Sequence, residues 1–199
     1  LKKKFDGTTQ IKELLKDGYP EVVIIWKDKE TGVLCKCRLD WLRPEAIVDV
    51  KSFSIKNKPH RSLYEIMANN IKDNYYNLQF SIYNEALDNV VKAINSGKAK
   101  IYGKVADEWK ERLLKNSNKQ FFVVFFRTAA PFQMKAIELE KFSNGNGSEN
   151  NYHQVANDNW RIGIKKYARA LKSGNWKEKE IETLDDIHIP NIIYQTLNY

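Results

Sequence analysis

The sequence predicts a mixed α/β domain of the α+β type, with one central β-sheet flanked by helices. Three observations support this prediction: a strand-rich stretch at Glu21–Ser52, a helical stretch at Ser62–Asn95, and two later strand-like segments at Gln120–Arg127 and Gln133–Glu140. Strands, then helix, then strands is the element order of a layered domain built around one sheet. The chain has 199 residues, so we expect a single domain over 1–199.

The strand-rich stretch is expected to form a meander of three antiparallel strands. Glu21–Trp26 is rich in β-branched and aromatic residues, and the turn residues of Asp28–Gly32 follow it. Val33–Trp41 then alternates in character, and a second turn through Arg43 and Pro44 leads to a short third strand at Ala46–Lys51.

Three helices are predicted after the strands. The stretch Ser62–Asn95 is expected to be one long helix, because apolar residues recur at spacings of four, three and four: Ile71, Tyr75, Leu78 and Ile82. A shorter amphipathic helix is expected at Val105–Leu114 and a basic helix at Tyr152–Ser173. Residues 143–148 have the composition of a mobile loop, and the tail 181–199 shows no clear pattern.

The charge of the chain indicates a polyanionic partner. Lys and Arg number 33 against 25 Asp and Glu, which gives a net charge of +8 and favours nucleic acid first. The longest apolar run, Phe121–Phe126, is too short to span a bilayer, and no signal peptide is visible. Cys35 and Cys37 are expected to be free thiols in a reducing cytoplasm. Leu1 is not an initiating Met, so the chain is a candidate for truncation at its N-terminus.

Two carboxylates and a lysine are expected to share one patch of the sheet. Alternation puts Asp49 and Lys51 on the same face of the third strand, and the turn through Arg43 and Pro44 brings Asp40 close to Asp49. Paired carboxylates bind a hard cation such as Mg²⁺, and a lysine beside them can orient water or neutralise charge on a phosphate. The alternative is an ordinary Asp49–Lys51 salt bridge on a solvated edge strand.

Three segments together resemble the PD-(D/E)XK nuclease superfamily: Cys35–Leu42, Ile47–Ser52 and Tyr76–Tyr83. Within the superfamily, the similarity is to the RecB-like exonucleases of phage and prophage recombination systems, including the exodeoxyribonuclease VIII-like domain. Gln79 and Tyr83 match the Q-x-x-x-Y motif of these proteins, and their spacing of four puts both on one helical face. The resemblance implies a restriction-endonuclease-like core.

The resemblance also implies the role of each site residue. Asp40 and Asp49 correspond to the metal-binding acids, with the backbone carbonyl of Val50 as a further ligand and Glu21 as an extra acid. The catalytic residues that it implies are Asp40, Asp49, Lys51, Gln79 and Tyr83, with Lys51 positioning the attacking water. The expected cofactor is Mg²⁺, for which Mn²⁺ can substitute. Relatives often carry an acid or histidine on an upstream helix, and Glu13 is the residue available there.

The implied substrate is DNA, cut by an exonuclease at duplex ends during recombination. The residues expected to contact it are Lys36, Arg38, Trp41, Lys56, Lys58, Arg61 and Tyr76. A second copy of the chain and a single-strand annealing protein are candidate partners, and no membrane is involved. The main alternative is a catalytically silent DNA-binding or assembly module on the same fold. An endonuclease, or a CRISPR-adaptation nuclease with an iron–sulfur cluster, is a further alternative, which two cysteines on one strand disfavour.

Overall fold

The protein is built on a five-stranded mixed sheet, seen in the computed structural model, which describes residues 9–54, 62–116, 119–139 and 152–176. The strand order is β1-β2-β3-β4-β5. The strands are β1 (Tyr19–Lys27), β2 (Leu34–Leu42), β3 (Ala46–Phe53), β4 (Gln120–Arg127) and β5 (Met134–Glu138). Only β3 and β4 pair in parallel, and the other neighbours are antiparallel. The predicted fold class, a mixed sheet with flanking helices in a restriction-endonuclease-like core, is confirmed.

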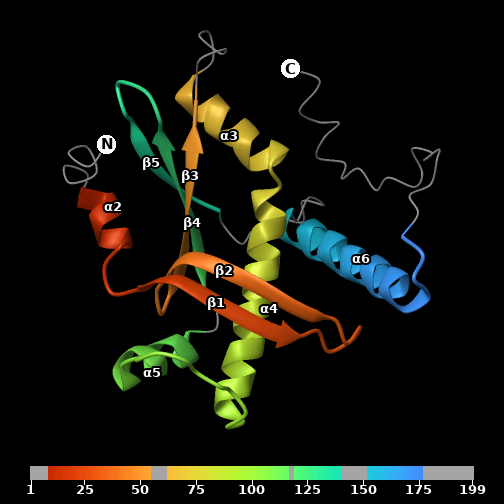
Figure 1. Ribbon diagram of the computed structural model, residues 1–199. Coiled ribbons are helices and arrows are strands. Elements are labelled where there is room, and N and C mark those ends of the chain that lie inside the picture. Colours follow the sequence, from red (N-terminus) through yellow and green to blue (C-terminus); the bar gives the residue numbers. More distant parts are fainter. Residues whose placement is uncertain (1–8, 55–61, 117–118, 140–151, 177–199) are drawn as a thin grey trace, which may run out of the picture.

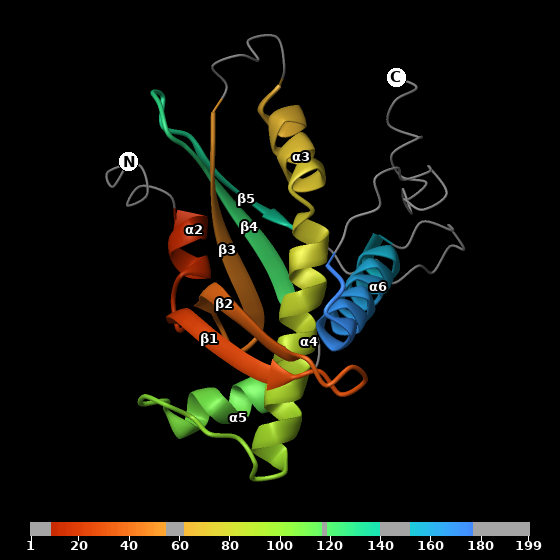
Figure 2. The same ribbon diagram turned by 45° about the vertical axis from the view of Figure 1, so that its right-hand side comes forward.

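Helices cover both faces of this sheet. They are α2 (Thr9–Leu14), α3 (Leu63–Asp73), α4 (Tyr76–Asn95), α5 (Asp107–Lys115) and α6 (Tyr152–Ser173). Figure 2 shows the layers in order: α2, then β3 and β4, then α4, with α6 outermost beside α4. Among the described helices, none is long and apolar enough to cross a membrane.

The helical stretch after β3 is two helices, which corrects the prediction of one. α3 begins at a capping box in which Ser62 and Glu65 exchange hydrogen bonds. The break comes at Tyr75, whose left-handed backbone (φ 52°) cannot continue a helix. The buried face of α4 also differs from the expected one. Its buried residues include Tyr76, Phe80, Tyr83 and Leu87, whereas Ile82 of the expected face is only partly buried against the same core.

The main core lies between the sheet and α4. Phe80 of α4 stacks on Phe121 of β4 with 4.5 Å between ring centroids, and Tyr76 packs near Phe125 of the same strand. A smaller cluster on the opposite face joins Ile11 of α2 to Val48 and Val124. Because both faces of the two central strands are covered, β4 is nearly all apolar, as its sequence suggested.

β1 and β2 leave the rest of the sheet as a two-stranded ribbon. The two strands pair from Tyr19 and Leu42 to Lys27 and Leu34, with a gap at Glu21 and Asp40. By contrast, β2 pairs with β3 only through Trp41 and Leu42. The ribbon therefore diverges from β3 beyond this point. In Figure 1 the ribbon passes across α4, and its strands run at a steep angle to β3 and β4. We call the point of divergence the fork.

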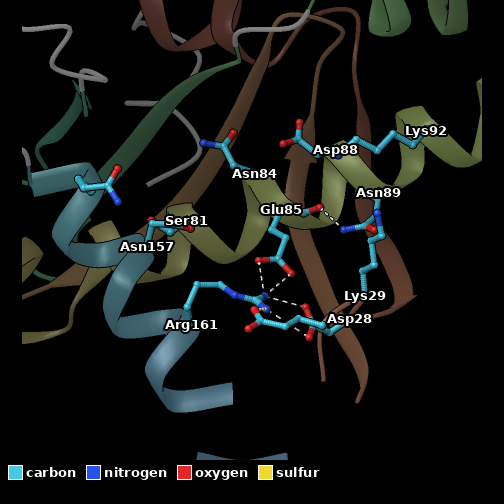
Figure 3. Close-up of a pocket in the computed structure, with 12 residues that line it drawn as sticks. Asp28, Lys29, Ser81, Asn84, Glu85, Asp88, Asn89, Lys92, Asn157 and Arg161 are labelled. Carbon is cyan, nitrogen blue, oxygen red and sulfur yellow. Dashed lines mark hydrogen bonds and ion pairs between the residues drawn. The ribbon is translucent and has the colours of Figure 1, made fainter. Parts of the chain in front are cut away.

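Arg161 of α6 holds the turn of this ribbon against α4. Its guanidinium lies 2.6 Å from a carboxylate oxygen of Asp28 in the ribbon turn, 2.7 Å from one of Glu30 and 3.2 Å from one of Glu85 on α4. Figure 3 shows the carboxylates of Asp28 and Glu85 turned toward the guanidinium of Arg161. Trp160 adds a hydrogen bond of 2.7 Å to Glu85. α6 is thus fastened to both the ribbon and α4.

The remaining helices and strands follow the predictions with small shifts of boundary. The short amphipathic helix is α5, the basic helix is α6, and the segment expected at Gln133–Glu140 is the shorter β5. The predicted loop at 143–148 and the tail at 181–199 lie outside the described residues.

Candidate functional site

Asp49 and Lys51 lie on the face of β3 that meets α4. Their neighbours in the same alternation, Ile47 and Phe53, belong to the main core beneath that helix. Asp49 is 1% exposed, and the Nζ atom of Lys51 lies 2.7 Å from its Oδ2 atom. Lys51 also sits over the ring of Tyr76, 5.0 Å from the centroid. The pair is therefore part of a buried central strand, and the solvated edge strand considered above does not describe it.

Gln79 and Tyr83 of α4 complete a hydrogen-bonded chain that begins at Asp49. The Nε2 atom of Gln79 donates to Oδ1 of Asp49 at 3.1 Å and to the hydroxyl of Tyr83. That hydroxyl donates in turn to the backbone carbonyl of Arg38 on β2, at 3.1 Å. Their spacing of one helical turn allows both side chains to reach the same place. The chain links α4, β3 and β2 around one carboxylate.

Asp40 occupies the fork between β2 and β3. Its Oδ2 atom accepts a hydrogen bond of 2.8 Å from the backbone N–H of Val50. This N–H follows Asp49 directly, at the place where β2 no longer pairs with β3. The turn through Arg43 and Pro44 therefore brings Asp40 back beside the residues that follow the fork.

The electrostatics of the site are dominated by burial. Burial raises the pKa of Asp49, the ion pair with Lys51 lowers it in part, and the nearby charge of Asp40 raises it further. Burial also raises the pKa of Tyr83 to about 12, so its hydroxyl keeps its proton at neutral pH and can donate to Arg38. The charge of Asp40 thus adds to the negative potential at Asp49, and added positive charge beside Asp49 is favourable.

The donor set at the fork fits a hard divalent cation. Mg²⁺ prefers oxygen ligands and keeps several waters, so one or two carboxylates suffice to hold it. Asp40 and Asp49 offer such oxygens, and Val50 adds a backbone carbonyl between Asp49 and Lys51. Within the described ranges, no group of three or more His, Cys, Asp and Glu side chains could hold a metal. A site here would therefore rely on two acids, the backbone and water.

Two further acids were expected near the site, and the register of β1 and β2 sets one of them, Glu21, opposite Asp40. The exposed carboxylate of Glu21 forms an ion pair of 3.0 Å with Arg38. Glu13 lies on α2, the helix that covers the opposite face of the sheet, and pairs with Lys16 just beyond the helix at 2.6 Å. In the described part of the chain, the ion-pair partners of these two acids are Lys16 and Arg38 rather than groups of the fork.

The residues expected to contact DNA differ in position. Lys36 and Arg38 are exposed on β2, in the same alternation as Asp40. Trp41 instead packs with the small cluster around Val48, on the face away from Asp49. Tyr76 is only 9% exposed and lies under Lys51, so it supports that lysine rather than offering a surface. Lys56, Lys58 and Arg61 lie outside the described residues.

A large cleft lies away from this site, between α4 and α6. Its volume is about 910 Å³, and it is lined by Asn84, Glu85, Asp88, Asn157 and Arg161, among others (Figure 3). The α4 residues that line it lie on the opposite side of the helix from Gln79 and Tyr83. Its lining includes Lys29, Lys92 and Arg161, and Arg161 is already paired with three carboxylates. The chemistry therefore favours the fork over the larger cleft as the functional site.

Comparisons with known proteins agree with the fold. Residues 2–99 match the sequence model of a family described as a PDDEXK-like domain of unknown function (DUF3799). That range contains β1–β3 and α4. It therefore includes all the candidate site residues: Asp40, Asp49, Lys51, Gln79 and Tyr83. No curated protein matches the chain in sequence.

One solved structure supports the same fold across most of the chain. It is the crystal structure of a protein from Eubacterium rectale that is described as a candidate exonuclease, with a TM-score of 0.50 at 13% identity. The match covers 94% of this chain and 63% of the other, so the chain spans less than two thirds of that protein's length.

Proposed function

We propose that this protein is a metal-dependent deoxyribonuclease of the RecB-like type, acting as an exonuclease on duplex DNA ends in phage or prophage recombination. The observation that carries the proposal is the buried Asp49–Lys51 pair held by Gln79, with Asp40 at the adjoining fork. The PDDEXK-like family match over residues 2–99 supports it. A buried acid and lysine that serve only stability need neither a second carboxylate nor a supporting amide.

Each residue of the site has a defined task in phosphodiester hydrolysis. Asp40 and Asp49, with the Val50 carbonyl, are the groups that would hold the metal ion. The ion itself supplies Lewis-acid stabilisation of the charge that develops on the phosphate. Lys51 is close enough to the metal-binding acid to orient a water for attack on phosphorus and to stabilise negative charge there.

Gln79 and Tyr83 act on this centre by positioning it. The Gln79 amide fixes one oxygen of Asp49 and leaves the other to Lys51. Tyr83 holds the amide in turn and is itself anchored on the backbone of β2. Such preorganisation lowers the cost of arranging the charged groups when substrate arrives.

The test is metal-dependent cleavage of a linear duplex, compared with a covalently closed circle. We expect Mg²⁺ or Mn²⁺ to support degradation of the linear DNA and EDTA to stop it, while the circle survives. Asp49→Asn and Lys51→Ala should each abolish cleavage and retain a folded protein. The matched controls are Asp88→Asn and Lys92→Ala, which alter exposed residues on the opposite side of α4.

The results separate the proposal from its alternatives. Cleavage at the normal rate by the Lys51→Ala variant would refute the assignment of the site. Cutting of the circle would identify an endonuclease. Binding of DNA without cleavage under any metal would favour the catalytically silent module. The proposal also includes one domain over 1–199, a cytoplasmic location, and self-association or an annealing protein as partners.

A further inference from the structure

The outward surface of the β1–β2 ribbon is unusually apolar for a solvent-facing sheet. We define the ribbon face as the side chains that point away from the core: Val23, Ile25 and Lys27 of β1, and Leu34, Lys36 and Arg38 of β2. Val23 is 49% exposed, Ile25 61% and Leu34 74%. Since the alternate residues of both strands are buried in the main core, the ribbon cannot turn these side chains inward.

The pairing of the two strands mixes these aliphatic groups with cations. Val23 lies opposite Arg38, Ile25 opposite Lys36, and Leu34 opposite Lys27. Every outward pair therefore joins one aliphatic side chain to one positive charge.

Acids are largely kept off this face. Asp28 and Glu30 of the ribbon turn are bound by Arg161 on α6. The carboxylate of Glu21 reaches the ribbon face only at its end nearest the fork, where it pairs with Arg38. The ribbon face is thus a positive surface with apolar spaces between its charges.

The ribbon face also leads directly to the proposed metal site. Lys36, Arg38 and Asp40 follow one another at alternate positions of β2. At a rise of about 3.4 Å per residue, Lys36 is about 14 Å along the strand from Asp40, and Leu34 about 20 Å. The backbone of Arg38 receives the hydrogen bond of Tyr83 from within the site. A polymer lying along the ribbon would therefore arrive at the fork.

We propose that the ribbon face binds an unpaired DNA strand and guides it to the fork. The inference rests on the proposed nuclease function and adds the form of DNA that the site receives. The three cations suit three phosphates, and the aliphatic side chains suit the unstacked bases and sugars between them. A duplex turns phosphates outward and keeps its bases stacked, so it would leave Val23, Ile25 and Leu34 without apolar partners.

Charge argues against a second copy of the chain as the occupant. Arg38 is paired with Glu21, but two ribbon faces brought together would still set Lys27 and Lys36 of one copy against those of the other, and like charges placed face to face oppose association. A polyanion removes that repulsion. The net charge of +8 points in the same direction.

The test measures binding of a labelled 12-nucleotide oligo-dT and of a labelled blunt duplex by fluorescence anisotropy. EDTA is present throughout, so that cleavage plays no part. Ile25→Ser/Leu34→Ser should weaken oligo-dT binding about tenfold with little effect on its salt dependence. Lys27→Gln/Lys36→Gln should reduce the slope of log K against log salt by about 1.4, because each phosphate contact on a single strand contributes about 0.7.

Matched controls lie on the connection between α4 and α5. Ile101→Ser/Tyr102→Ser removes a comparable exposed apolar area, and Lys98→Gln/Lys104→Gln removes the same charge. Both should leave oligo-dT binding within twofold of wild type. Circular dichroism and the midpoint of urea unfolding establish that the ribbon variants fold.

Three results would overturn the inference. If the ribbon variants bind oligo-dT as tightly as the control variants do, the ribbon face is not the binding surface. If these variants lose as much affinity for the duplex as for oligo-dT, the ribbon face does not prefer an unpaired strand. A dimer in sedimentation that the Ile25→Ser/Leu34→Ser variant disrupts would identify an interface between copies. By contrast, a protein that binds the strand through the ribbon and never cuts it would refute the nuclease proposal alone.

Discussion

Replacing Arg161 with alanine would leave a buried carboxylate without its counter-ion. Asp28 is 3% exposed, and Arg161 contacts both of its oxygens, at 2.6 and 3.3 Å. Burial opposes ionisation of Asp28, but the hydrogen bonds from Arg161 and Thr31 outweigh it and hold its pKa well below the usual range. The carboxylate is therefore ionised at neutral pH, and the variant must either desolvate that charge alone or open the ribbon turn.

The expected loss of stability follows from these contacts. Removing one partner of a buried pair costs about 3–5 kcal/mol. The lower end applies here, because Arg161 is 22% exposed and Thr31 still donates two hydrogen bonds to Asp28. We therefore expect Arg161→Ala to lower the free energy of unfolding by about 3 kcal/mol, which for a chain of this length lowers the melting temperature by about 6–12 °C.

Urea unfolding followed by tryptophan fluorescence measures this loss, and a double-mutant cycle with Asp28→Asn isolates the pair. The asparagine retains the acceptor for Thr31 and removes the charge. The double variant should thus be more stable than Arg161→Ala alone. A loss below about 0.5 kcal/mol for Arg161→Ala, or a double variant less stable than the single one, would refute the reasoning.

The pH dependence provides a separate check. The folded state lowers the pKa of Asp28, so the stabilisation by the pair is complete above the unfolded pKa near 3.8. It is lost progressively as the pH falls below that value. The gap in stability between wild type and Arg161→Ala should therefore be full at pH 6 and narrow below pH 4. An unchanged gap at low pH would show that packing, rather than charge, accounts for the effect.

Three further variants test other contacts. Gly18→Ala would place a Cβ atom 2.2 Å from the indole nitrogen of Trp41, so we expect the free energy of unfolding in urea to fall by about 1–3 kcal/mol. An unchanged unfolding midpoint would contradict this close approach. Tyr83→Phe leaves Gln79 without its second partner and should lower kcat with little change in KM, whereas an unchanged kcat would remove Tyr83 from the positioning chain. Tyr75→Gly should retain or slightly raise the unfolding midpoint, because glycine adopts φ 52° without strain, and a marked fall would show that the exposed ring contributes to packing.

Local patterns predicted most of the elements. The β-branched run at Val22–Ile25 and the alternation of Lys36 and Arg38 with buried cysteines are direct consequences of strand geometry, and both strands are present. The spacing of Gln79 and Tyr83 put both on one helical face, and the resemblance to the Q-x-x-x-Y motif put them at the site. Such features depend on neighbours within a few residues, which is why sequence suffices for them.

Features that depend on distant partners were not predicted. The pairing of Arg161 with Asp28 joins residues 133 apart in sequence, and the turn around Asp28 shows only a common loop composition. The break at Tyr75 carries no Gly or Pro, so nothing local distinguishes it from the helix on either side. The face of α4 was misplaced because tyrosines can be buried or exposed, and here contact with β4 buries Tyr76 and Tyr83.

The contact between Lys51 and Asp49 also bears on how the protein reaches its folded state. The lysine supplies a positive charge from within the chain itself, 2.7 Å from a carboxylate that is 1% exposed. Folding therefore does not depend on a dissolved ion to neutralise that acid, unlike small domains that are unfolded without their metal. A metal ion that binds Asp49 must displace the ammonium of Lys51. Its affinity therefore depends on the difference between the two interactions with the carboxylate. Replacing Lys51 with alanine should thus tighten metal binding in calorimetry even as cleavage is lost.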